Sequence, residues 1–191
     1  AHLLESALNT NNSYFSREQL DRIRNILIIL VRNPDPKPEG ESETGFDPFT
    51  RSFNCVRGQA MHGIFQYSLY LIRQEEDKAN HKIINGYIEP EIRQVLEEKL
   101  DKTIEPSLAV HSVFGAFITQ LYFNSREWLE KNLNEIFSED ENMSTYWKSA
   151  WDAYIFTSNV YKDVFKLLVP QYQRGITLLS NRDQDKNDVS S

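Results

Sequence analysis

The chain has 191 residues, of which 40% are hydrophobic and 26% charged, a composition typical of a globular rather than a disordered protein. Its formal net charge of -7 argues against binding to nucleic acid, because affinity for phosphate backbones requires clustered Lys and Arg. The single cysteine, Cys55, excludes an internal disulfide and a zinc site built from several thiolates, and it fits a reducing, cytoplasmic setting. No secretory signal and no apolar run of roughly 18 residues is present, so we expect no membrane association.

The N-terminal third is predicted to contain one clear helix followed by a long loop. Ser16, with Gln19 three residues later, forms a capping box that predicts a helix extending to about Arg32. Residues 33–48 carry four prolines, two glycines and five acidic residues, and they contain too little apolar surface to order themselves. We therefore expect a mobile connector at 33–48; the alternative is a partner-binding loop.

Residues 54–73 form the stretch around which the rest of the chain is organised. Apolar side chains recur there at steps of three and four, at Val56, Ala60, Ile64, Tyr67 and Leu71. The opposite side carries Met61, Phe65, Leu69 and Ile72, so the segment is apolar on most of its circumference. Such a pattern predicts a helix buried between other helices.

Further helical segments follow to the end of the chain. Pro90 suits a first helical turn, and Ser107 and Ser125 are predicted N-caps. The predicted helices cover residues 91–102, 107–121, 125–137, 143–156 and 159–179, with Pro170 kinking or ending the last one. No stretch alternates with period two. We predict one all-α domain over residues 1–180 and a disordered tail at 181–191.

Small residues between large ones recur in three of these helices, including Gly58, Gly63 and Gly115, and would allow close helix packing. Apolar helices at intervals of roughly 40 residues are typical of HEAT and armadillo repeats. The predicted fold is therefore an irregular HEAT/armadillo-like helical-repeat array, and the alternative is a closed helical bundle.

Three short sequences suggest a family resemblance over roughly residues 45–170. FNCVRGQA at 53–60, VHSVFG at 110–115 and SAWDAY at 149–154 resemble the helical region of very large bacterial multidomain proteins. Those proteins couple such regions to an NTPase or another effector domain, and some act in defence against phage. The resemblance implies a scaffold or sensor region of a longer polypeptide and transfers no catalytic residue. The chain has no Gly-rich phosphate-binding loop of its own.

Arg57 and His62 form an Arg-x4-His pair that looks like the short motif of the HEPN ribonucleases, which are all-helical and metal-independent. In that chemistry His moves the proton of a ribose 2′-hydroxyl and Arg steadies the phosphate charge. The pair lies early in this chain, whereas the family motif lies late, and five residues rotate about 140° around a helix, so the two side chains need not converge. The alternative interpretation is structural, with Arg57 paired to a carboxylate and His62 buried and hydrogen-bonded.

We assign structural roles to Arg57, Asn54 and Gly58 at the start of the central helix. A cation in a first helical turn is disfavoured by the helix dipole and should have a carboxylate partner. Asp47, other loop acids or a neighbouring helix would supply it. The remaining histidines show no metal-ligand spacing, so we expect no metal and no cofactor. The predicted function is a non-catalytic helical scaffold or interaction module that binds a protein partner or other domains of the same polypeptide; the alternative is the HEPN-like ribonuclease.

Overall fold

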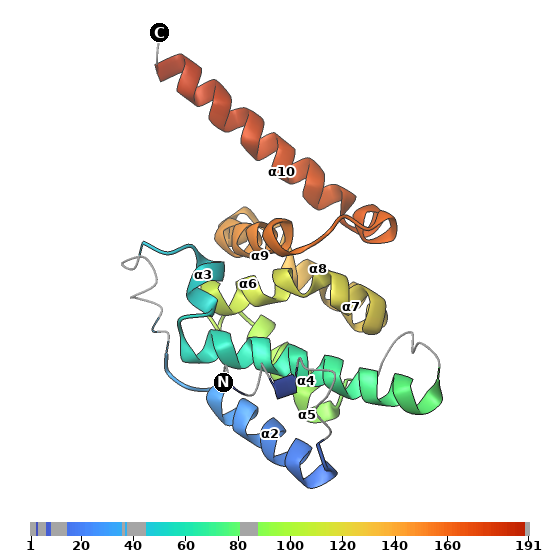
Figure 1. Cartoon of the computed structure of the whole chain (residues 1–191). Coiled ribbons are helices and arrows are strands. Elements are labelled where there is room, and N and C mark those ends of the chain that lie inside the picture. Colours follow the sequence, from blue (N-terminus) through green and yellow to red (C-terminus); the bar gives the residue numbers. More distant parts are fainter. Residues whose placement is uncertain are drawn as a thin grey trace. The chain divides into compact units, whose positions relative to one another are not determined.

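The computed structural model describes residues 3, 7–8, 15–35, 37, 45–80 and 88–189, with side chains described up to residue 180 (Figure 1). All regular structure in these residues is helical, which confirms the all-α class. The described helices include none that is both long and apolar enough to cross a membrane. The chain divides into two compact units, residues 1–158 and residues 159–191.

The first unit contains the helices predicted between residues 16 and 156, together with two short elements, Pro48–Ser52 and Glu141–Met143, that the sequence did not indicate. In chain order they are α2 (Arg17–Leu30), α3 (Pro48–Ser52), α4 (Val56–Ala79), α5 (Pro90–Leu100), α6 (Leu108–Ala116), α7 (Ile118–Asn124), α8 (Arg126–Ile136), the 3-10 turn η2 (Glu141–Met143) and α9 (Ser144–Thr157). The capping box of Ser16 and Gln19, Pro90 at the start of α5 and the Ser107 cap of α6 are all confirmed. Ser125 occupies the N-cap position of α8, but its side chain makes no capping hydrogen bond.

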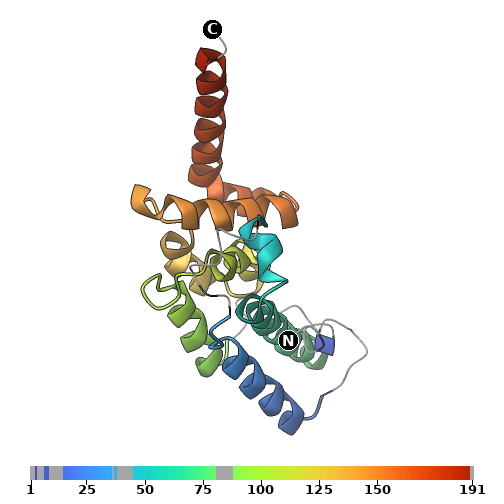
Figure 2. The same ribbon diagram turned by 90° about the vertical axis from the view of Figure 1, so that its left-hand side faces the viewer.

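Helix α4 is buried on most of its circumference, as its sequence predicts. Helix α2 packs along one side of α4 and also meets α5, an arrangement that Figure 2 shows in a second view. Gly63 faces α2, and a Cβ there would lie 2.6 Å from Cδ2 of Leu27. Only a glycine therefore allows the two helices to approach this closely without a shift of Leu27.

Helix α6 is the most enclosed element, since every residue from Ala109 to Ala116 is buried. It contacts α3, α4, α5, α7, α8 and α9, most extensively α9. A Cβ at Gly115 would lie 2.6 Å from the carbonyl carbon of Ala150, so α6 and α9 meet backbone to backbone. Helix α6 therefore has neighbours from many parts of the chain, and the repeat array and the closed bundle both stay predictions within the all-α class.

The single helix predicted for residues 107–121 is divided in the structure. Phe117, with φ -102° and ψ 9°, separates α6 from α7. Its aromatic ring stacks on Phe65 of α4, with 4.5 Å between ring centroids and 11° between planes. The break keeps both halves apolar, which explains why the hydrophobic period did not reveal it.

The second unit covers residues 159–191 and contains α10 (Lys162–Val189). Pro170 lies inside this helix, so it does not end it. The side chains of residues 181–191 are outside the described part, and the disordered tail expected there stays a prediction. Most of the loop predicted at 33–48 also lies outside the described residues; only 33–35, 37 and 45–48 are described.

Candidate functional site: two buried clusters on α4

The N-terminus of α4 is capped from a distance. Cys55 occupies the N-cap position without a side-chain capping bond. Instead, the Val56 amide donates to Oδ2 of Asp35 at 2.8 Å, and the Arg57 amide donates to the Asp35 carbonyl oxygen at 3.0 Å. The carboxylate at this position also complements the positive end of the helix dipole. The exit from α2 is thereby fixed to the first turn of α4.

Arg57 joins three segments through its guanidinium group. Nη1 donates to the carbonyl oxygen of Asn33 at 2.7 Å, and Nη2 donates to Oε1 of Glu105 at 3.1 Å. Nε lies 3.0 Å from Oε2 of the same carboxylate. Both side chains are buried, with exposed fractions of 10% and 2%. The carboxylate partner is Glu105, just before α6, while Asp47 caps the N-terminus of α3.

Glu105 is the centre of a larger buried cluster. Nζ of Lys99 lies 3.0 Å from Oε2, and the Ser107 amide donates to Oε1 at 3.2 Å. Nε2 of His111 donates to the main-chain carbonyl oxygen of Glu105 at 2.8 Å. A buried carboxylate requires several such donors to offset the loss of its hydration. We call Arg57, Lys99 and Glu105 the ion cluster.

His62 occupies a different environment, which we call the His62 cluster. Its Nε2 lies 2.8 Å from Oγ of Ser52, and Ser52 donates its own proton to the Phe49 carbonyl oxygen at 2.7 Å. With the single Ser52 proton assigned to the Phe49 carbonyl oxygen, Nε2 of His62 is the donor to Oγ. The imidazole stacks on Phe53, with centroids 4.3 Å apart, and is flanked by Phe49 and Phe117. Burial lowers the pKa of His62 to about 4, so the ring is neutral at pH 7.

The two residues of the Arg-x4-His pair therefore enter separate clusters. Arg57 contacts Asn33 and Glu105, whereas His62 contacts α3 and the aromatic rings around it. Both are buried, and their described contacts include no common partner. Each of the two side chains is hydrogen-bonded by protein groups, and the structural role assigned to the pair stays a prediction.

Gly58 allows α3 to pack closely against α4, and Asn54 closes the end of α3. A Cβ at Gly58 would lie 2.6 Å from Cα of Ser52 and would also collide with the Ser52 carbonyl oxygen. Nδ2 of Asn54 donates to the Thr50 carbonyl oxygen at 2.8 Å, which satisfies an acceptor at the end of α3. Glycine is required at position 58 by close approach rather than by backbone conformation.

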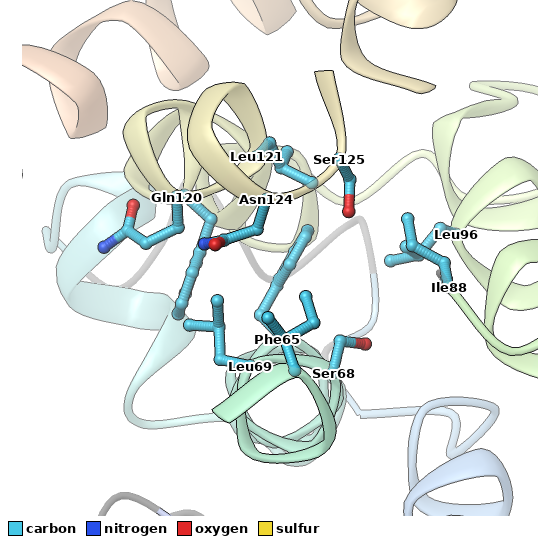
Figure 3. Close-up of a pocket in the computed structure, with 11 residues that line it drawn as sticks. Phe65, Ser68, Leu69, Ile88, Leu96, Gln120, Leu121, Asn124 and Ser125 are labelled. Atoms are coloured by element: carbon cyan, nitrogen blue, oxygen red, sulfur yellow. The ribbon is translucent and has the colours of Figure 1, made fainter. Parts of the chain in front are cut away.

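An apolar cavity lies between α4, α5 and α7. Figure 3 shows Phe65, Ser68 and Leu69 of α4 below Leu121 and Asn124 of α7, with Leu96 of α5 to one side. The cavity measures about 20 Å³. A water needs on the order of 10–15 Å³ by the same measure, so this space holds about one water and no organic ligand.

An exposed aromatic pair on the first unit was not predicted from the sequence. Phe156, near the end of α9, is 81% exposed, and Phe53, after α3, is 43% exposed. Phe49 lies between them, with ring centroids 5.8 Å from Phe156 and 5.0 Å from Phe53. We call Phe53 and Phe156, seated on Phe49, the aromatic surface. Helical periodicity placed Trp147, Trp151 and Tyr154 on the buried side of α9. Phe156 lies outside that apolar face, and this position is the signal that could have indicated its exposure.

No group of His, Cys, Asp and Glu side chains in the described part of the chain is arranged to hold a metal ion. Comparison of the chain with protein-family models, with curated proteins and with solved structures finds no match. The functional conclusion therefore depends on the geometry of this chain alone.

Proposed function

We propose that this chain is a non-catalytic helical scaffold or interaction module of a larger bacterial protein, and that the aromatic surface is where it binds a protein partner or another domain of the same polypeptide. The observation that carries the proposal is the 81% exposure of Phe156 beside Phe53. Exposed aromatic side chains that are held by a rigid support are typical of interaction surfaces, where they dominate the binding energy.

The chemistry of the aromatic surface indicates the kind of partner. Two phenyl rings offer apolar area and no hydrogen-bonding group, so they suit apolar side chains of a protein segment. The net charge of -7 argues against nucleic acid as the ligand. A regulatory or sensor role would follow if the bound segment belonged to an effector domain.

The alternative, a ribonuclease that uses Arg57 and His62, is less well supported by the geometry. The Arg57 guanidinium already binds Glu105 and Asn33, so its charge is neutralised within the protein. His62 is 3% exposed and donates through Nε2 to Ser52. A phosphate and a ribose hydroxyl would have to displace buried contacts to reach either group.

Site-specific photo-crosslinking tests the proposal. A photoreactive phenylalanine analogue is placed at Phe156 and, as a matched control, at Lys131, which is exposed on α8. In cells that express the native polypeptide, we expect a discrete adduct to a protein segment from position 156 and none from position 131. Equal labelling at both positions, or no adduct at 156, would contradict the proposal.

A cleavage assay tests the alternative. The purified chain is incubated with single-stranded RNA without metal, and we expect no cleavage. Cleavage that is lost in both Arg57→Ala and His62→Ala, with both variants folded, would establish the ribonuclease instead.

A further inference from the structure

The aromatic surface is mechanically connected to a buried histidine. Phe156 rests on Phe49, Phe49 packs edge-on against Phe53, and Phe53 stacks on the imidazole of His62. Ser52, between the two phenylalanines in sequence, receives the hydrogen bond from Nε2 of the same ring. Every aromatic residue of the surface is thus within two ring contacts of His62.

Helix α3 depends on tertiary contacts for its stability. It is five residues long, and a helix of that length is unstable without tertiary support. It packs against α6, α4 and α9. Its described contacts with α4 are the close approach at Gly58, the hydrogen bond from Gln59 to the Phe53 carbonyl oxygen and the contacts of Ser52, Phe49 and Phe53 with His62. Of these, only the contacts to His62 involve a group that titrates near neutral pH when it is exposed.

We propose that His62 is the positioning residue of the aromatic surface and that protonation of its imidazole releases α3, and with it the support beneath Phe53 and Phe156. This inference rests on the proposed function for its biological meaning, since it assigns a control to the same surface. The structural part, an acid-sensitive latch formed by α3 and His62, is tested on the isolated chain.

The environment of His62 explains the direction of the response. Its described contacts are Ser52 and the rings of Phe49, Phe53 and Phe117, so the charged imidazolium would be enclosed by apolar groups. Burial, rather than a neighbouring charge, lowers its pKa to about 4. The charged groups nearest to it in sequence are Asp47 and Arg51 at α3 and Arg57 on α4; the elements around it also carry His111 on α6 and Lys148 and Asp152, which pair with each other on α9. None of these groups is among the described contacts of His62.

The size of the effect follows from linkage. With a pKa of about 4 when α3 is docked and 6.5 when the ring is exposed, acidification favours the released state. Between pH 7 and pH 5 the equilibrium constant for release should rise about 20-fold. The local response belongs to α3, whereas amides of α8, which contains no histidine, should exchange through the slower opening of the whole unit.

Hydrogen exchange measured at pH 7 and pH 5, and corrected for the intrinsic rate, tests the latch. We expect the hydrogen-bonded amides of residues 50–54 to exchange about 20-fold faster at pH 5 than at pH 7 in the wild type, and at both pH values faster than amides of α8, which should open only with the whole unit. His62→Gln retains an amide donor for Ser52 but does not titrate, so its α3 should show no pH response. His111→Gln, the matched control, should keep the response of the wild type.

Several outcomes would overturn the inference. These are an unchanged α3 at pH 5, a response that survives in His62→Gln, or exchange of α3 no faster than that of α8, which would indicate global unfolding. Should His62→Gln fail to fold, the comparison of α3 with α8 in the wild type still decides. Crosslinking at Phe156 is independent of this measurement, so the latch and the binding function can fail separately.

Discussion

Arg57 of the ion cluster and His62 of the His62 cluster lie five residues apart on α4, yet one is buried as a charged group and the other as a neutral group. Arg57 is buried as a charged group because Glu105 and the Asn33 carbonyl oxygen replace its hydration. His62 is buried as a neutral group because aromatic rings enclose it and one hydroxyl accepts its proton. An arginine stays charged when it is buried, so it needs a partner of opposite charge. A histidine can lose its proton, so it can be buried in the neutral form without such a partner.

The ion cluster should be the more costly of the two to break. Arg57→Ala leaves Glu105 and Lys99 buried with one cation fewer, and it also frees the Asn33 carbonyl oxygen. We expect a loss of roughly 3 kcal/mol in the free energy of unfolding, measured by urea denaturation, because Lys99 still compensates the Glu105 charge. Arg57→Lys should recover only part of this loss, because an ammonium cannot make two parallel bonds to a carboxylate. Equal denaturation midpoints for the three proteins would show that the cluster contributes nothing.

The contribution of the His62 cluster to the free energy of unfolding should instead depend on pH. His62 has a pKa of about 4 when folded and 6.5 when unfolded, so the unfolded state binds more protons at intermediate pH. Its contribution is complete above about pH 6.5 and is lost as the pH falls toward about 4, amounting to roughly 3 kcal/mol. Burial lowers the pKa of His111 to about 4 as well, which adds a loss in the same window. In urea titrations at several pH values, His62→Gln should flatten part of this dependence; an unchanged slope would contradict the assignment.

The contact between α3 and α4 supports the His62 cluster and can be broken without any change of charge. Gly58→Ala places a Cβ against the backbone of Ser52, and backbone cannot move aside as a flexible side chain can. We expect a loss of about 1–3 kcal/mol and faster hydrogen exchange in α3. Gly45→Ala offers a contrast, because no atom lies within 4 Å of the added Cβ there, although its φ of 67° favours glycine. A fully stable Gly58→Ala protein would show that the close approach is not required.

A surface ion pair should have the smallest effect. Arg32 binds Glu98 through two hydrogen bonds, at 2.8 and 3.3 Å, but its side chain is half exposed. Arg32→Ala should cost no more than about 1 kcal/mol, and the cost should shrink in high salt. A loss as large as that of Arg57→Ala would mean that burial does not distinguish the two pairs.

The sequence predicted local features of the fold better than long-range ones. Caps at Ser16 and Ser107 and the start of α5 at Pro90 are encoded within one helical turn, so they could be read directly. The break at Phe117 was missed because apolar spacing continues through it. Helical class followed from periodicity, but the central position of α6 depends on contacts among segments far apart in the chain.

The candidate site was predictable only in part. The dipole argument indicated that Arg57 needs a carboxylate, but Glu105 lies 48 residues away and no local pattern selects it. The aromatic surface depends on where α9 ends relative to α3, which periodicity within α9 does not specify. Asp35 as a distant cap for α4 likewise results from tertiary packing and not from any capping signature next to Val56.

Double-mutant cycles test the central claim, that Arg57 and His62 belong to separate structural clusters. The free energy of unfolding is measured for the single and double variants of Arg57→Ala with Glu105→Ala, and of Arg57→Ala with His62→Ala. We predict a coupling of about 1–3 kcal/mol for Arg57 with Glu105, and additivity within about 0.5 kcal/mol for Arg57 with His62. Additivity in the first cycle together with strong coupling in the second would contradict the account and would place both residues in one site.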